Sequence, residues 1–144
     1  MNILKVLTAR RRLGNLGEKE AARFLRRKGY RILERNYVGK WGEMDLIARK
    51  KNCLCFVEVK TRNSESEYSF ESRPAASVNP EKQRRLIKIA TEYAHRIHKE
   101  SGCMMRMDII EVLTHRDTKD KIKVKKIVHI ESAFDLNSAY KIRK

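Results

Sequence analysis

Apolar positions along the chain recur at two different periods, which together predict a mixture of helices and strands. Residues 13–28 have apolar side chains at helical spacing, and Gly29 then supplies a helix stop. A second helix is predicted over residues 79–99, because Asn79 can act as its N-cap and Pro80 stands at its first position. These two helices divide the chain into regions with strand character.

Strand character appears in five segments, three between the helices and two after them. The expected strands are residues 30–37, 43–48, 53–60, 104–113 and 121–130. The first three would form a meander, and the long helix would cross over to a further strand. The order implies an α/β domain with a mixed central β-sheet flanked by helices.

The third strand is unusual because it is apolar throughout Cys53–Val57 and then becomes charged. An apolar run of this kind indicates a strand covered on both faces. Glu58 and Lys60 are two residues apart, so their side chains share one face. If the preceding hairpin turn centres on residues 51–52, Asp45 lies directly across from Glu58.

The same register places Glu43 across from Lys60, so carboxylates and one ammonium gather at the end of an apolar sheet. Like charges that face each other across strands repel, and buried charge is costly without a partner. A divalent cation such as Mg²⁺ would offset this repulsion, because hard cations take carboxylate oxygens and waters. The alternative is a structural ion pair between Lys60 and either Glu43 or Glu58.

These residues also carry a resemblance to a known group of proteins. The run from Gly42 to Ala48, followed by Phe56 to Arg62, resembles the PD-(D/E)xK nuclease superfamily. It is most similar to the YraN family of small bacterial proteins, which in turn resembles archaeal Holliday-junction resolvases. The likeness extends from Gly14 to about Phe134 and implies a restriction-endonuclease-like fold.

The resemblance implies hydrolysis of phosphodiester bonds with Mg²⁺ or Mn²⁺ as cofactor. Asp45, Glu58 and the carbonyl of Val59 are the expected metal ligands, and Glu18 or Glu43 would complete the shell. Lys60 would contact the attacking water or the pentavalent phosphorane. The catalytic residues that we expect are Asp45, Glu58, Lys60 and Gln83.

Two of these expectations have structural alternatives. Glu18 borders the apolar stripe of the first helix, where a carboxylate is also favoured simply by the helix dipole. Gln83 falls on the apolar stripe of the second helix, and a buried amide needs hydrogen-bond partners near the helix end. Asp108 matches an aspartate of the resembling family, and we expect it to be structural.

The formal net charge of +16 on 144 residues indicates a polyanionic partner. Nucleic acid, and DNA in the first place, is favoured over an anionic membrane surface, because neither helix pairs a basic face with a large exposed apolar one. The side chains expected to contact phosphates are Arg10, Arg11, Arg12, Arg23, Arg26, Arg27, Arg62, Lys82, Arg84, Arg85 and Lys88. Tyr37 and Trp41, beside the acidic cluster, suit either the core or stacking on unpaired bases.

The domain organisation follows from composition. Residues 1–12 are expected to form a flexible basic arm or an early extension of the first helix, and residues 13–136 a single nuclease-like domain. Residues 63–78 lack periodicity and predict a mobile loop, and residues 137–144 a basic tail. Three cysteines, an odd number, and the lack of a secretory signal favour a cytoplasmic protein with reduced thiols.

The sequence therefore favours a metal-dependent DNA endonuclease or exonuclease, acting on substrates that include branched, Holliday-junction-like DNA. The alternative is a non-enzymatic DNA- or RNA-binding accessory protein that keeps the nuclease fold. Resolvases act as dimers on a symmetric junction, so a homodimer is expected by analogy alone.

Overall fold

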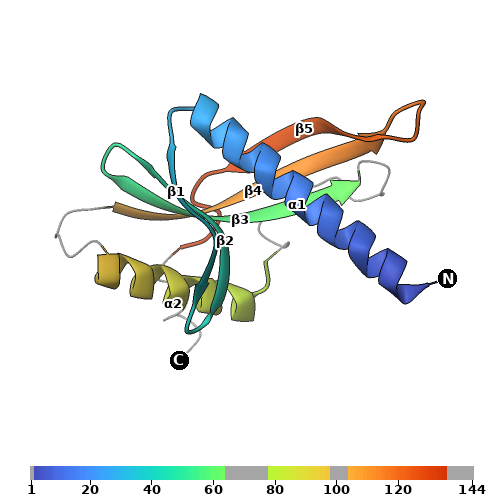
Figure 1. Cartoon of the computed structure of the whole chain (residues 1–144). Helices are drawn as coiled ribbons and strands as arrows, with labels where there is room; N and C mark the ends of the chain where they lie inside the picture. Colours follow the sequence, from blue (N-terminus) through green and yellow to red (C-terminus); the bar gives the residue numbers. More distant parts are fainter. Residues whose placement is uncertain (1, 64–77, 98–103, 136–144) are drawn as a thin grey trace.

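The computed structural model describes residues 2–63, 78–97 and 104–135. The described residues form two helices and five strands in the predicted order (Figure 1). The elements are α1 (Ile3–Arg27), β1 (Arg31–Gly39), β2 (Gly42–Lys50), β3 (Cys53–Asn63), α2 (Pro80–Ile97), β4 (Met104–Arg116) and β5 (Ile122–Ile130). The expected loop over residues 63–78 and the expected tail over residues 137–144 lie outside the described residues, apart from Asn63 and Val78.

The five strands form one sheet in the order β1-β2-β3-β4-β5. Neighbouring strands are antiparallel except β3 and β4, which run parallel from Cys53↔Met104 to Asn63↔Thr114. A parallel pair needs a crossover connection, and α2 lies in it. The predicted α/β fold, a mixed central sheet flanked by helices, is therefore confirmed.

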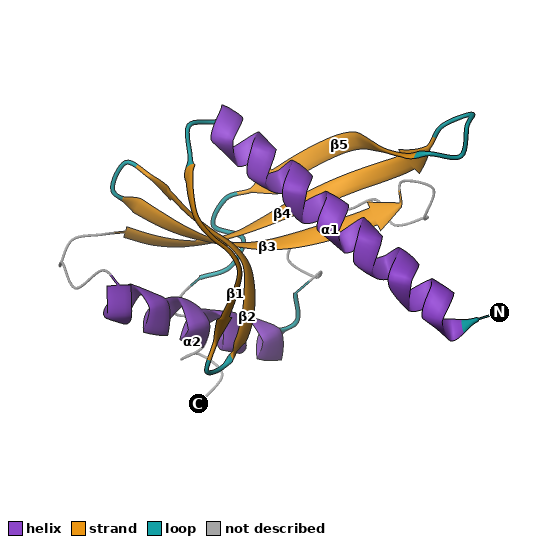
Figure 2. Ribbon diagram, viewed as in Figure 1, coloured by secondary structure: helices purple, strands orange, loops and turns teal. Residues whose placement is uncertain are grey.

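The two helices cover opposite faces of the sheet (Figure 2). Alternate residues of β3 accordingly enter two separate cores: Leu54 and Phe56 pack with α2, whereas Cys55 and Val57 pack with α1. All four side chains are buried, which explains why this stretch of the sequence is apolar at every position. None of the helices in the described part of the chain is long and apolar enough to cross a membrane.

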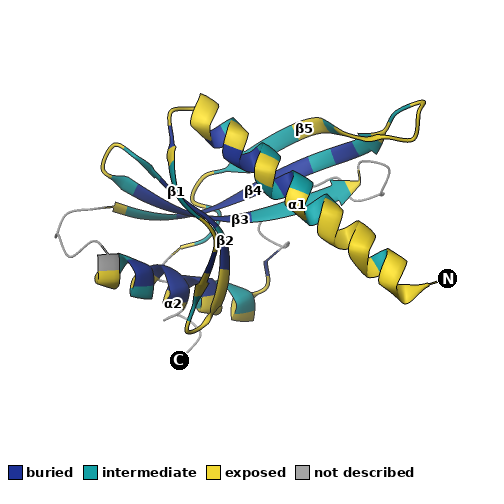
Figure 3. Ribbon diagram, in the orientation of Figure 1, coloured by how far each residue is buried: buried dark blue, intermediate teal, exposed yellow. Residues whose placement is uncertain are grey.

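Residues 3–12 are the first part of α1. They do not form the flexible arm predicted for residues 1–12 but the alternative, an early extension of the first helix. The side chain of Asn2 caps α1 by accepting a hydrogen bond from the Leu4 amide at 3.0 Å. No proline interrupts the segment that follows. This half of α1 extends beyond the sheet and is exposed (Figure 3), including the apolar side chains of Ile3, Leu4 and Leu7.

The second helix begins as predicted. The Asn79 side chain accepts from the Lys82 amide at 2.8 Å, and the Asn79 carbonyl accepts from the Gln83 amide at 2.9 Å. This cap satisfies amides that the first helical turn would otherwise leave unpaired. It fixes the start of α2, and with it the position of the side chains in the first turn.

The sheet divides at one point, and this division creates the site. β2 and β3 pair only between Lys50↔Cys53 and Leu46↔Val57. Beyond Leu46, traced back toward Gly42, β2 stays paired with β1 alone, while β3 continues along β4 to Asn63. Figure 1 shows the β1–β2 hairpin turning away from β3 and β4 and lying alongside α2. The first residues past the division are Asp45 and Glu58.

Candidate active site

Asp45 and Glu58 stand at the point where β2 and β3 separate. The hairpin turn at residues 51–52 is closed by Lys50↔Cys53, and the last β2–β3 pair is Leu46↔Val57, so Asp45 and Glu58 are the next residue on each strand. The predicted pairing of Glu43 with Lys60 is wrong, because β2 leaves β3 before Glu43 and pairs it with Val38 of β1 instead. The Val59 amide lies beyond the last β2–β3 pair and donates to Asp45 Oδ2 at 2.8 Å. The Asp45 side chain thus bridges the gap that the departing strand leaves.

A bend in the β1–β2 hairpin orients Asp45. Asn36 stands across from it, between the pairs Arg35↔Leu46 and Tyr37↔Met44, and has φ of 51°. Asparagine tolerates this left-handed conformation better than most residues. Because of the bend, two residues of β2 that alternation would place on one face lie on opposite faces of the sheet. Met44 packs in the core beneath α2, whereas Leu46 packs beneath α1. Sequence reasoning missed this residue, although an asparagine within a strand was the available signal.

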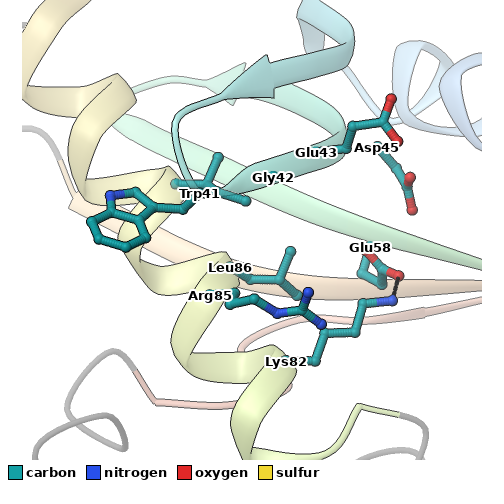
Figure 4. Close-up of a pocket in the computed structure, with 9 residues that line it drawn as sticks. Trp41, Gly42, Glu43, Asp45, Glu58, Lys82, Arg85 and Leu86 are labelled. Atoms are coloured by element: carbon teal, nitrogen blue, oxygen red, sulfur yellow. Dashed lines mark hydrogen bonds and ion pairs between the residues drawn. The ribbon is translucent and has the colours of Figure 1, made fainter.

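Glu58 is buried, and two ammonium groups from different elements lie against its carboxylate. Lys82, on the first turn of α2, donates from Nζ to Glu58 Oε1 at 2.6 Å (Figure 4). Lys60 Nζ lies 3.4 Å from the same oxygen, which confirms that Glu58 and Lys60 share one face of β3. Lys82 was predicted only as a phosphate contact, because the rotation of α2 about its axis cannot be read from the sequence.

The environment alters the ionisation of these groups. Burial raises the pKa of Asp45 to about 7, the Glu58 charge adds to this, and the Val59 hydrogen bond opposes it. Burial lowers the pKa of Lys60, although the charge of Glu58 opposes this. For Lys82 burial acts downward too, but the hydrogen bond to Glu58 and its charge outweigh burial and raise the pKa.

Glu18 and Glu43 are near this pair but differ in placement. Burial raises the pKa of Glu18, a hydrogen bond with Asn36 lowers it, and the charges of Glu43 and Glu58 raise it further. Glu18 therefore reaches from α1 to Asn36, the residue of β1 that stands across from Asp45. Glu43 is exposed, and Figure 4 shows its carboxylate on the side of Asp45 away from Glu58.

A cavity of about 270 Å³ opens beside the two carboxylates, between the β1–β2 hairpin and α2. Its lining residues are Trp41, Gly42, Glu43, Asp45, Glu58, Lys82, Arg85, Leu86 and Ile89. Acidic groups stand at one end and Trp41 at the other (Figure 4). A cavity with convergent polar groups and perturbed pKa values has the character of an active site.

The donor set fits a hard divalent cation with few protein ligands. In the described part of the chain, no three side chains of His, Cys, Asp or Glu gather closely enough to hold a metal ion. Asp45 and Glu58 remain as two carboxylates. Mg²⁺ keeps several waters and is commonly bound through one or two carboxylates plus substrate phosphates. The two carboxylates therefore suit Mg²⁺ or Mn²⁺, which would keep several water ligands, better than a metal ion coordinated by protein groups alone.

The Gln83 side chain does not face the carboxylates but is a hydrogen-bonded amide near the start of α2, which was the structural alternative. Its side-chain Nε2 donates to the Val78 carbonyl at 2.9 Å, across the start of α2. The residue does not line the cavity beside Asp45 and Glu58. The neighbouring Lys82, one position earlier, is the α2 side chain that reaches the carboxylates.

The side chains predicted to contact phosphates are distributed over both faces of the molecule. Arg10, Arg11, Arg12, Arg23, Arg26 and Arg27 are exposed along α1, and Lys82, Arg84, Arg85 and Lys88 lie on α2. Arg85 lines the cavity, and Lys88 lies over the Trp41 ring. Arg62 instead pairs with a buried glutamate. Of the two faces, α2 is the one that borders the cavity.

That glutamate, Glu111, was not predicted. It lies within β4, directly beside Lys60 in the register, and its side chain is fully buried. Arg62 Nε lies 3.3 Å from Glu111 Oε1, yet neither Glu111 oxygen has a hydrogen-bond partner among the described residues. Burial raises the pKa of Glu111 to about 7, and the Arg62 charge opposes the shift. A charged residue inside the apolar run from Ile109 to Leu113 was the available signal.

Asp108 lies in a separate polar network. Its carboxylate accepts from Arg106 Nε at 2.9 Å and from the Ser132 amide at 3.0 Å, and His129 Nε2 lies 2.8 Å away. Although burial acts in the opposite direction, these hydrogen bonds lower the pKa of Asp108. The network joins β4 to β5 and to the segment after it, and none of these residues lines the cavity.

Comparison with known protein sequences assigns the chain to a family. Residues 17–112 match the sequence model described as uncharacterised protein family UPF0102, also known as the YraN family. A UPF0102 protein of Chlorobium phaeobacteroides (strain BS1) is 43% identical over 123 residues, which are 85% of this chain and 93% of the relative.

Two further relatives are as similar. The UPF0102 protein of Caldanaerobacter subterraneus is 43% identical over 122 residues, covering 85% of this chain and 93% of the relative. That of Caldicellulosiruptor saccharolyticus is 43% identical over 103 residues, covering 72% and 83%. Residues 17–112 include α1 from Gly17, the strands β1, β2 and β3, α2 and most of β4, and the chain therefore belongs to the UPF0102 family.

Proposed function

We propose that this protein is a metal-dependent nuclease that hydrolyses phosphodiester bonds in DNA. One observation carries the proposal: Asp45, Glu58 and Lys60 meet at the division of the sheet, beside a cavity bordered by basic residues of α2. Two carboxylates that repel each other, with a lysine next to them, are the arrangement expected where a cation and a phosphate are bound together.

Asp45 and Glu58, with the Val59 carbonyl, would hold Mg²⁺ or Mn²⁺. When bound, the ion would make a water more acidic and offset the charge that develops on the phosphate. Lys60 is held beside Glu58 and is placed to stabilise the same negative charge electrostatically. Lys82 orients the Glu58 carboxylate through its hydrogen bond.

The substrate is proposed to be DNA held largely through its phosphates. Arg85 and Lys88, next to the cavity, can contact the backbone without reading base sequence. The resemblance to resolvases includes branched DNA among the candidates and favours a homodimer. We place the activity in the cytoplasm, where the thiols of Cys53 and Cys55 stay reduced.

A second candidate function is supported by a specific contact. The Lys82 ammonium already neutralises Glu58, at 2.6 Å, without a metal ion. A site balanced by its own lysine suits an accessory protein that binds DNA or RNA and keeps the nuclease fold without its activity. The two functions differ in whether metal-dependent cleavage accompanies binding.

The test uses the purified full chain with Mg²⁺ or Mn²⁺ on linear, flapped and four-way DNA. We expect cleavage that falls by about 100- to 1,000-fold in Asp45→Asn and in Lys60→Ala, as for loss of a group that stabilises developing charge. Asp45→Asn keeps an oxygen that can accept from the Val59 amide, so the fold should persist.

Asp120→Asn, an exposed carboxylate in the turn between β4 and β5, is the matched control and should cleave normally. Cleavage that survives both active-site substitutions would remove the proposed site. Strong binding to all three DNAs, with no cleavage under either metal, would favour the accessory function.

A further inference from the structure

Trp41 stands apart from the groups that act on the phosphate, although it lines the same cavity. We propose that its indole ring is a stacking platform for an unpaired base, so that the substrate is DNA with a single-stranded segment next to the cleavage site. The inference rests on the proposed function, because it assumes that the cavity receives DNA.

The placement of Trp41 is not explained by the turn it occupies. Lys40 and Trp41 form the two-residue turn between β1 and β2, closed by Gly39↔Gly42. Two-residue turns favour asparagine, aspartate and glycine. Trp41 is instead a large aromatic residue that remains 43% exposed, so it contributes little to the core.

Helix α2 holds the tip of this hairpin in position. The Lys40 amide donates to Glu92 Oε1 at 3.4 Å, and Ile89 lies against the backbone at Gly42. Lys88 Nζ lies 4.4 Å from the centroid of the Trp41 ring, and Lys40 Nζ lies 5.4 Å from it. The ring is therefore a positioned surface with two ammonium groups close to it.

The ring and the carboxylates belong to one cavity. Figure 4 shows Trp41 at one end, Asp45 and Glu58 at the other, and the Arg85 guanidinium between them. A strand with one base on Trp41 would carry its backbone along Arg85 toward the carboxylates. The cavity thus offers a base contact, a phosphate contact and the reacting groups in that order.

Stacking on this ring requires a base that is not already stacked in a duplex. Aromatic side chains beside basic grooves bind successive bases of single strands with little sequence preference. An exposed contact between an ammonium and an indole is weaker than stacking of a base. An incoming base should therefore displace Lys88, whose ammonium is then available for the adjacent phosphate.

The experiment uses Trp41 as its own reporter, because it is the single tryptophan of the chain. The metal-free full chain is titrated with a thymidine oligonucleotide, an abasic oligonucleotide of the same length and a blunt duplex of two fully complementary strands. We expect the thymidine strand to quench Trp41 fluorescence and the other two to bind without comparable quenching. Equal quenching by the abasic strand would overturn the inference.

Variants then separate stacking from charge. Trp41→Ala should lower affinity for the thymidine strand about tenfold while leaving abasic binding unchanged, and Trp41→Phe should restore most of the loss. Val38→Ala is the matched control, since Val38 is a second exposed apolar side chain of the same hairpin that does not line the cavity. Affinity in Trp41→Ala equal to that of the wild type would also overturn the inference.

Quenching is measured without metal and again in Asp45→Asn, so its outcome is independent of cleavage. Quenching by the thymidine strand in a protein that cleaves no DNA would refute the nuclease and leave the stacking platform. Cleavage without selective quenching would support the nuclease and refute the stacking platform. Failure to bind any of the three ligands would overturn the stacking platform.

Discussion

Burial, more than the nearest charge, sets the pKa of two acidic side chains in this sheet, Asp45 and Glu111. Asp45 and Glu111 differ in surroundings, yet burial is the larger cause that raises each pKa to about 7. Glu111 has a guanidinium nearby but no hydrogen bond from it. A buried carboxylate without hydrogen bonds is costly when ionised. These two residues should therefore reduce stability as the pH rises.

At the residue scale, Glu111→Gln should stabilise the protein at alkaline pH. The folded pKa of about 7 exceeds the ordinary 4.5, so the folded state binds the proton more tightly. The stability that this proton confers is present below about pH 4.5 and is lost as the pH rises through about 7. Glutamine avoids the loss, and we expect the free energy of unfolding to gain roughly 1–3 kcal/mol at about pH 8.

Urea unfolding at about pH 5 and about pH 8 measures this effect. The gain should shrink strongly at the lower pH, and Asp120→Asn, in an exposed pair, should show no such pH dependence. An equal effect of Glu111→Gln at both pH values would mean that packing, rather than ionisation, governs the site.

At the scale of elements, the approach of α1 to β3 depends on one glycine. A Cβ atom at Gly17 would overlap Thr61 Oγ1 and lie 3.0 Å from Thr61 Cβ. Gly17 is buried within α1, beside Glu18, so this close contact also sets how near Glu18 comes to the carboxylates. Gly14, one turn earlier, has no atom within 4 Å of such a Cβ.

We predict opposite effects for alanine at these two positions. Gly14→Ala should raise the free energy of unfolding by about 0.5–1 kcal/mol, because alanine loses less backbone freedom in a helix. Gly17→Ala should lower it by about 1–3 kcal/mol through overpacking. Thermal and urea unfolding of the two variants compare the same substitution in one helix.

The clash at Gly17 can be relieved from the other side. Combining Gly17→Ala with Thr61→Ala removes the nearest oxygen, so the double variant should lose less stability than the two single losses added together. Strict additivity would show that Gly17 acts through the helix alone and not through its contact with β3.

At the scale of the whole molecule, positive charge covers two faces while the cavity opens on one. The exposed Arg26 and Arg27 belong to α1, and Arg85 and Lys88 to α2, on the opposite face of the sheet. Binding that depends on phosphates weakens with salt in proportion to the number of contacts. The salt dependence can therefore identify the face that holds DNA.

We expect Arg85→Ala to weaken duplex binding similarly across sequences and to reduce the slope of log affinity against log salt by about 1. Arg26→Ala is the matched control, of equal charge but on α1, and should leave the slope nearly unchanged. Fluorescence anisotropy over a series of salt concentrations measures both. A larger change in Arg26→Ala would assign the DNA to the α1 face.

The sequence alone determined the elements and the pairing of β2 with β3. Periodicity identified both helices, although not the start of α1 at Ile3, and all five strands, because burial on one or two faces determines the spacing of apolar residues. The short turn at residues 51–52 sets the β2–β3 register as far as Leu46↔Val57, which leaves Asp45 and Glu58 as the next residue on each strand, since register follows turn length. Strand alternation alone predicted that Lys60 lies on the same face of β3 as Glu58.

Only the tertiary structure decided which groups from other elements join this pair. Lys82 rather than Gln83 reaches Glu58, since the rotation of α2 is set by its packing on the sheet. The division of the sheet and the bend at Asn36 likewise depend on contacts between segments distant in sequence. Local spacing specifies elements and their nearest register, whereas the three-dimensional arrangement of the cavity depends on long-range packing that spacing does not record.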